Sequence, residues 1–105
     1  LFRSDEAGAT LSAVRLARPF DGARYRLSGE LPADAQRMML EMTASGLSVK
    51  NAQYDIDGEL VPAMDTAPFA GLWTLRAGPH TVIGRVWLAD GRTLETQPVR
   101  IVVLP

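Results

Sequence analysis

Cysteine is absent from this 105-residue chain, and histidine and lysine occur once each, as His80 and Lys50. The absence of cysteine excludes disulfides and thiolate metal sites. No apolar run approaches the roughly 20 residues that a helix needs to cross a bilayer. Acidic and basic side chains nearly balance, 12 against 11, which argues against a purely electrostatic nucleic-acid binder.

The composition predicts one small folded domain, because 47% of the residues are hydrophobic and disordered chains are far more polar. Residues 1–10, LFRSDEAGAT, mix charged and small residues without periodicity, so we interpret them as a linker or the remnant of a preceding region. The domain then covers residues 11–105. Leu1 is not an initiator methionine, and the first ten residues lack the apolar core of a signal peptide. We therefore expect a piece of a longer protein, or a processed one.

Apolar residues recur at every second position through most of the chain, which is the period of a β-strand with one buried face. Met38, Leu40 and Met42 form one such set, and Tyr54 and Ile56 belong to another. We predict strands at residues 12–18, 23–28, 36–43, 49–57, 59–62, 69–75, 80–89 and 93–104. Short strands separated by frequent turns are typical of an immunoglobulin-like antiparallel β-sandwich, here of about seven to eight strands.

Turn residues separate the alternating runs. Asp57-Gly58 and Asp90-Gly91 favour tight hairpins, because Asp-Gly readily adopts positive φ. We also predict turns at Pro19–Gly22, Ser45-Gly46 and Gly78-Pro79. Residues 33–44, ADAQRMMLEMTA, have a composition that favours helix, but the alternation from residue 38 to residue 42 favours strand.

The chain offers no set of residues for catalysis. A Ser-His-acid triad would need His80 beside a serine, and no Gly-x-Ser-x-Gly elbow is present. His80 follows Gly78-Pro79 at the start of a predicted strand, so we interpret it as a residue that fixes a corner of the sandwich. We predict no catalytic residue and no cofactor.

An acidic stretch, Asp55-Ile56-Asp57-Gly58-Glu59, suggests calcium at first sight. An EF-hand loop needs its glycine later and a glutamate six residues beyond it, where this chain has Met64. Alternating carboxylates on a strand that enters a β-turn account for the same residues. We predict no metal site.

Five residues form the candidate binding surface that we predict: Trp87, Arg15, Arg18, Arg24 and Arg26. The arginines alternate with apolar residues, as on a solvated sheet face, and a face of this kind can recognise phosphate or carboxylate groups. Trp87 is out of phase with Val86 and Leu88 and should point away from the core. It is then either covered by a linker or an adjoining domain, or offered to a ligand such as a sugar ring.

The order of these motifs resembles one bacterial family, the C-terminal domain of bifunctional penicillin-binding proteins of the 1C type. The resemblance spans about residues 15 to 105. It departs from the family at Gln53-Tyr54, where an aromatic pair is expected. The matching segments are Pro19-x-Asp21-Gly22-Ala23, Leu31-Pro32-x-x-x-Gln36, Tyr54-Asp55-Ile56-Asp57-Gly58, Ala67-Pro68-Phe69, Trp73-Thr74-Leu75-x-x-Gly78-x-His80, Asp90-Gly91 and Val99-x-Ile101-x-Val103.

The resemblance implies a parent with a membrane anchor, a glycosyltransferase domain and a transpeptidase domain that build peptidoglycan in the periplasm. The transpeptidase motif Ser-x-x-Lys cannot lie in this chain, because its only lysine, Lys50, follows Leu47 at the serine position. The resemblance thus implies a non-catalytic accessory module. Its expected partners are its own transpeptidase domain, peptidoglycan or another envelope protein such as a bacterial alpha-2-macroglobulin.

Immunoglobulin-like modules of secreted glycosidases and surface proteins share several of these motifs. The alternative function is therefore a carbohydrate-binding or adhesin-type module. A Trp87 side chain offered as an aromatic platform would favour that alternative.

Overall fold

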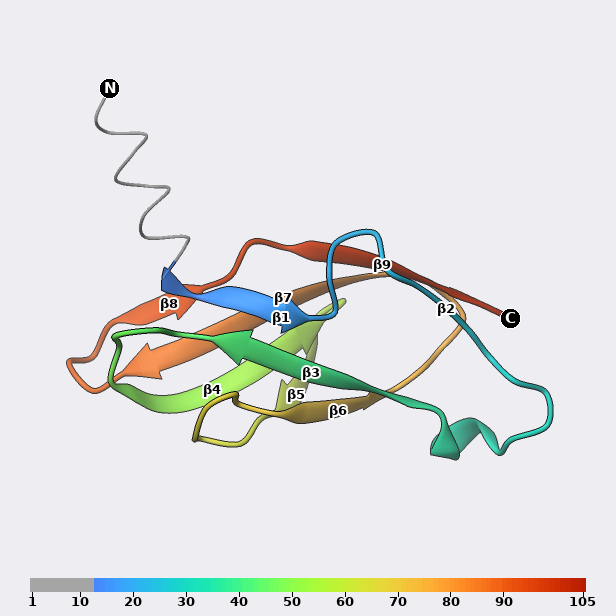
Figure 1. Ribbon diagram of the computed structural model, residues 1–105, viewed down its shortest axis with the longest axis horizontal. Helices are drawn as coiled ribbons and strands as arrows, with labels where there is room; N and C mark the ends of the chain where they lie inside the picture. Colours follow the sequence, from blue (N-terminus) through green and yellow to red (C-terminus); the bar gives the residue numbers. More distant parts are fainter. Residues whose placement is uncertain (1–12) are drawn as a thin grey trace, which may run out of the picture.

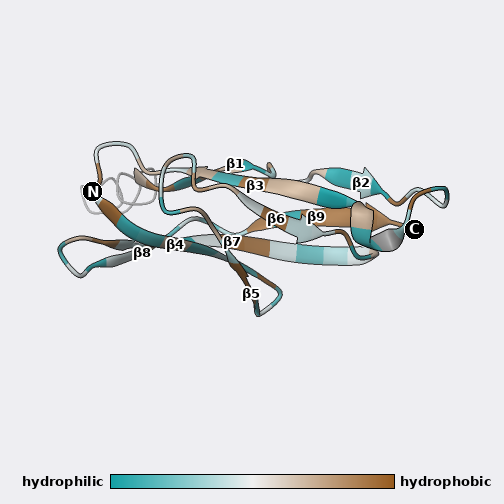
Figure 2. Cartoon of the chain, turned by 90° about the horizontal axis from the view of Figure 1, so that it is seen from below, coloured by the Kyte–Doolittle hydropathy of each residue, from teal (hydrophilic) through white to brown (hydrophobic). Residues whose placement is uncertain are grey.

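The computed structural model describes residues 13–105, which form two β-sheets packed face to face (Figures 1 and 2). Within this part of the chain one sheet has three strands in the order β1-β3-β6. The other has six, in the order β2-β9-β7-β4-β5, with β8 beside β7. The strands are β1 (Arg15–Arg18), β2 (Arg24–Arg26), β3 (Arg37–Thr43), β4 (Val49–Ile56), β5 (Glu59–Pro62), β6 (Gly71–Thr74), β7 (Gly78–Leu88), β8 (Thr93–Glu95) and β9 (Val99–Leu104).

The alternation in the sequence corresponds to the two faces of each strand. Met38, Leu40 and Met42 of β3 are buried, whereas Met39 between them is exposed. The same inward sets on β4, β7 and β9 meet them across the sandwich to form one core. The predicted immunoglobulin-like sandwich is confirmed, and residues 37–43 are a strand, preceded by a short 3-10 turn at Ala33–Ala35.

Three details of the predicted strands are wrong. Gly78-Pro79 is not a turn but the first two residues of β7, opposite Val103 and Val102 of β9. The expected strand 93–104 is two strands, β8 and β9, separated by Thr96–Pro98. Thr96 still donates its N–H to Gly84 O of β7, whereas Pro98 has no N–H to donate. The described residues thus form nine strands, one more than the upper expected number.

The sandwich is also not wholly antiparallel, because β2 runs parallel to β9. The chain passes from β1 in the small sheet to β2 in the large sheet over the predicted turn at residues 19–22. There the Gly22 N–H donates to Arg100 O at 2.8 Å, and after β2 the Leu27 N–H donates to Leu104 O. Alternation marks which face of a strand is buried but not its neighbour, so the sequence did not predict this pair.

Tyr54 of β4 connects the large sheet to the segment that leads into the small one. Its side chain is fully buried, and its hydroxyl donates to Phe69 O at 2.7 Å. Burial raises the pKa of Tyr54 strongly, and the Glu41 carboxylate raises it further, so the hydroxyl keeps its proton and remains a donor. Phe69 itself has φ of 55°, which is uncommon for a bulky residue, and the bond holds this bend in place.

We expect Tyr54→Phe to lower the free energy of unfolding by about 1–2 kcal/mol, because the buried Phe69 carbonyl would lose its partner. Urea unfolding followed by tryptophan fluorescence measures this change. Tyr25→Phe is the matched control, since Tyr25 is only half-buried and no hydrogen bond of its hydroxyl is found among residues 13–105. Equal losses in the two variants would contradict the role given to the Tyr54 hydroxyl.

Candidate binding surfaces

Trp87, Arg24 and Arg26 lie on the outer face of the six-stranded sheet. On β7 the residues Val82, Gly84, Val86 and Leu88 point into the core, so Trp87 points outward, where it is half-buried beside Asn51 of β4 and Thr93 of β8. Arg24 and Arg26 are exposed on either side of the half-buried Tyr25. Their partners in the parallel ladder are Val102 and Leu104, which also face outward.

The five predicted surface residues do not form one site. Pro79 pairs with Val102 beside Arg24, so that level lies eight residue positions along β7 from Trp87, about 26 Å at 3.3 Å per residue. Arg15 and Arg18 lie on β1, in the other sheet. Arg18 contacts Glu41 at 3.5 Å, and this ion pair between an exposed and a half-buried side chain is of small energetic value.

His80 makes two side-chain contacts at one end of the sandwich, as expected of a residue that fixes a corner. Its Nδ1 lies 2.6 Å from Asp57 Oδ2 and its Nε2 lies 2.7 Å from Arg76 O. Both partners are acceptors, so only a doubly protonated ring donates to both at once. The ring also packs edge-on against Trp73, with 4.8 Å between ring centroids.

Asp57 joins the hairpin turn to this corner. Its Oδ1 accepts from the Thr81 N–H at 2.9 Å while Oδ2 contacts His80. Partial burial acts to raise the pKa of Asp57, but the hydrogen bonds from His80 and Thr81 and the nearby positive charges outweigh it and hold the pKa below its ordinary value. Asp55 Oδ1 caps the same turn by accepting from the Gly58 N–H. The carboxylates that suggested calcium thus have hydrogen-bonding roles in the turn.

Arg76 covers the outside of this corner. Its guanidinium stacks over the Trp73 ring, 5.3 Å from the centroid, and forms an ion pair with Glu59 of β5. This pair lies at one end of a cleft of about 330 Å³ between β5 and β6, lined by Glu59, Leu60, Val61, Pro62, Leu72, Trp73, Thr74 and Arg76. Figure 2 shows β5 turning away from the rest of the sandwich.

A second hollow of about 430 Å³ adjoins the cleft and is mostly apolar, lined by Met39, Pro62, Ala63, Met64, Ala70, Gly71 and Leu72. Four large apolar side chains around the two hollows are 41–60% exposed: Met39, Leu60, Met64 and Leu72. We call these four residues the apolar edge surface. Met39 and Leu72 are direct cross-strand partners on the outer face of the small sheet. The alternation in the sequence predicted that Met39 points outward. It did not predict the other members of the apolar edge surface, because they lie elsewhere in the chain.

The strand next to this surface has a free edge. The Leu75 N–H donates to Gln36 O on the β3 side, whereas Ala70 O accepts from the Met64 N–H on the opposite side. Backbone groups alternate along a strand, so those of Leu72 and Thr74 turn to the side of β6 on which no strand of residues 13–105 pairs. A row of unpaired N–H and C=O groups beside apolar hollows is a template for an added strand.

The sequence matches no protein-family model, and no curated protein matches it either. Several solved structures share the fold. A fibronectin(III)-like module of Clostridium thermocellum CbhA has a TM-score of 0.73 at 22% identity, over 87% of this chain and 94% of that one. CopC from Methylosinus trichosporium OB3b has a TM-score of 0.51 at 22% identity, over 88% and 94%.

An endo-beta-1,4-mannanase of Cellulomonas fimi matches over 86% of this chain but only 18% of its own, with a TM-score of 0.60 at 18% identity. At these identities the likeness establishes the fold alone. The chain therefore has an immunoglobulin-like β-sandwich fold, which it shares with a fibronectin(III)-like module. No helix within residues 13–105 is long and apolar enough to cross a membrane.

We expect the unfolding free energy to fall as the pH drops below the ordinary carboxyl pKa of 3.8 and through the lower folded pKa of Asp57. The folded-state pKa is depressed, so this stabilisation is present above the unfolded value and is lost on acidification. Asp57→Asn should flatten that part of the profile, measured by urea unfolding between pH 2 and pH 7. Asp34→Asn, on the exposed 3-10 turn, should keep the wild-type shape. A wild-type profile in Asp57→Asn would contradict the contribution of Asp57.

Proposed function

We propose that this chain is a non-catalytic accessory module of a periplasmic peptidoglycan synthase, a penicillin-binding protein of the 1C type, and that it docks on a protein surface. The observation that carries the docking function is the apolar edge surface with the free edge of β6 beside it. Patches of this kind on a small domain are typical of protein interaction sites. The expected occupant is the module's own transpeptidase domain or another envelope protein, such as a bacterial alpha-2-macroglobulin.

The chemistry of the apolar edge surface favours a protein over a sugar. Its four large side chains are leucine and methionine, flexible groups that suit a protein partner, whereas sugar rings stack on exposed aromatic faces. A platform for a sugar ring needs an exposed aromatic face, and among residues 13–105 only Phe20, on a turn, has an aromatic side chain that is mostly exposed. Free backbone groups of Leu72 and Thr74 add directional bonds for an extended segment of the partner.

The 1C-type assignment depends on the resemblance in the sequence. Much of the resemblance falls on residues that hold this fold together, including Asp57-Gly58, Trp73 and His80. We expect the reading frame upstream of Leu1 to encode the transpeptidase motifs Ser-x-x-Lys and Lys-Thr-Gly. Sequencing that frame tests the assignment, which a frame without both motifs would overturn.

The docking function is tested with two proteins. One is the protein encoded by that frame, ended before residue 13 so that it lacks the module, and the other is the labelled 105-residue chain, whose binding to it in trans is measured. We expect binding, and we expect Met39→Ser with Leu72→Ser to weaken it at least about tenfold, because central apolar contacts dominate interfaces. Fluorescence anisotropy measures the affinity. Phe20→Ser with Leu31→Ser removes two exposed apolar side chains elsewhere and should leave the affinity unchanged. Equal weakening by both double variants would refute docking through this surface, and no binding in trans would refute the transpeptidase domain as its occupant.

The alternative function, a carbohydrate-binding or adhesin-type module, is favoured by the partly exposed Trp87 on the outer face of the large sheet. SGBP-B of the Bacteroides ovatus mixed-linkage glucan utilization locus, solved in complex with a mixed-linkage heptasaccharide, matches 88% of this chain over 24% of its own, with a TM-score of 0.53 at 15% identity. Co-sedimentation of the chain with peptidoglycan sacculi at moderate salt separates the two functions. Retention that is lost in Trp87→Ala would favour the alternative; we expect no retention.

A further inference from the structure

Three exposed arginines lie together at one end of the outer face of the six-stranded sheet. Arg24 and Arg26 are two residues apart on β2, about 7 Å along the strand. Arg100 lies on the adjacent strand β9, whose outward residues are Arg100, Val102 and Leu104. The register places Arg24 opposite Val102, so Arg24 and Arg100 are diagonal neighbours, about 8 Å apart. We call Arg24, Arg26 and Arg100 the arginine face.

The arginine face carries positive charge that its surroundings leave largely uncompensated. Among residues 13–105 none of the three guanidinium groups is within 4 Å of a carboxylate, whereas Arg18, Arg76, Arg85 and Arg92 each have an acidic partner. The nearest acid along the chain is Asp21, whose Oδ1 accepts the Arg100 N–H at 2.9 Å. The whole chain has a net charge of −1, so the excess of positive charge here is local.

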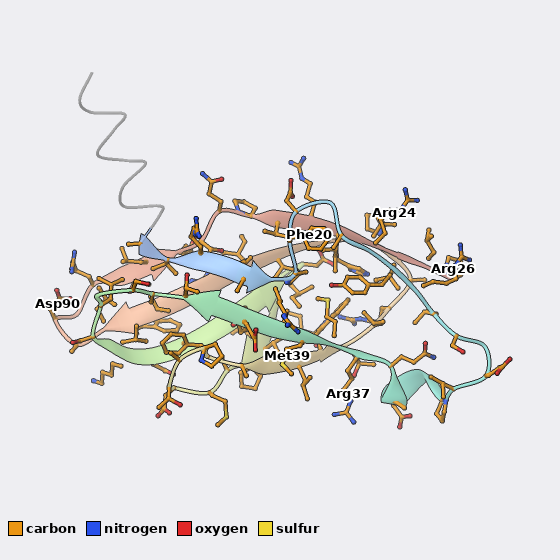
Figure 3. All side chains as sticks on the ribbon, viewed as in Figure 1. Phe20, Arg24, Arg26, Arg37, Met39 and Asp90 are labelled. Atoms are coloured by element: carbon orange, nitrogen blue, oxygen red, sulfur yellow. The ribbon has the colours of Figure 1, made fainter. Side chains whose placement is uncertain are left out.

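An exposed aromatic ring adjoins the arginine face. Phe20 is 71% exposed and lies in the turn before β2. Its carbonyl accepts the Ala23 N–H, and the neighbouring Gly22 N–H donates to Arg100 O, which fixes this turn against β9. Figure 3 shows Phe20, Arg24 and Arg26 along the same border of the molecule. Cations with an exposed aromatic side chain beside them suit the boundary between water and lipid.

We propose that the arginine face, with Phe20, binds the surface of a membrane that contains anionic phospholipids. Guanidinium groups bind phosphate through paired N–H donors. A site for one free phosphate needs hydrogen-bond donors that converge on it. The three guanidinium groups of the arginine face are instead spread over an open sheet surface, which matches the repeated headgroups of a bilayer. The strand order places β2 and β5 at opposite edges of the large sheet, so membrane binding would leave the apolar edge surface free.

The test is co-sedimentation of the 105-residue chain with vesicles of phosphatidylcholine alone, or mixed with phosphatidylglycerol. We expect binding to the mixed vesicles only, weakening as salt is added. Arg24→Gln with Arg26→Gln and Arg100→Gln should reduce the partition coefficient about a hundred-fold. The control, Arg15→Gln with Arg37→Gln and Arg92→Gln, removes the same charge elsewhere and should reduce it far less.

Two further variants separate loss of binding from loss of folding. Asp21→Asn keeps an oxygen that accepts the Arg100 N–H but removes the negative charge, so binding should increase about fivefold. Phe20→Ser should weaken binding to mixed vesicles at high salt, where the electrostatic attraction is screened. Equal losses in the two triple variants, binding to neutral vesicles, or binding to dextran sulfate but not to vesicles would each overturn the proposal. None of these outcomes depends on the docking partner of the apolar edge surface.

Discussion

The hydrogen bond from the Tyr54 hydroxyl to Phe69 O connects the two sheets of this sandwich. Tyr54 belongs to the large sheet, and Phe69 precedes β6 of the small one. A methyl group on Gly71, the first residue of β6, would lie 3.3 Å from the Tyr54 ring and 3.1 Å from Pro62 O, so β6 begins in close contact with both. The position of β6 determines where Leu72 meets Met39, and therefore where the apolar edge surface lies.

The sequence predicted the features that depend on side-chain alternation. Met38, Leu40 and Met42 are buried and Met39 is exposed, as their positions indicated, because a strand alternates its faces without reference to its neighbours. Strand pairing requires information that alternation lacks. The parallel pairing joins β2 to β9, more than 75 residues further along the chain. Gly78-Pro79 belongs to β7 because it pairs with β9, more than 20 residues away.

The same limit applies to the candidate sites. The pattern placed Trp87 and Arg24 outward, which is where the structure has them, but it could not tell that their levels lie eight residue positions apart along β7. Arg100 was not recognised as a neighbour of Arg24, because the two are 76 positions apart in the chain. The roles of Asp57 and Arg76 beside His80 were missed for the same reason, although the Asp-Gly turn itself was predicted correctly.

The two strands beside the cleft, β5 and β6, differ in the backbone groups at their free edges, because β5 contains Pro62. The tight Asp57-Gly58 hairpin turns the backbone groups of Glu59 and Val61 toward β4, so those of Leu60 and Pro62 face the solvent. Proline supplies no N–H there, so a second molecule cannot extend the large sheet at its β5 edge by an unbroken ladder. β6 has no proline. Uncontrolled polymerisation through β5 is thus hindered, whereas the backbone N–H and C=O groups of Leu72 and Thr74 on β6 have no such interruption.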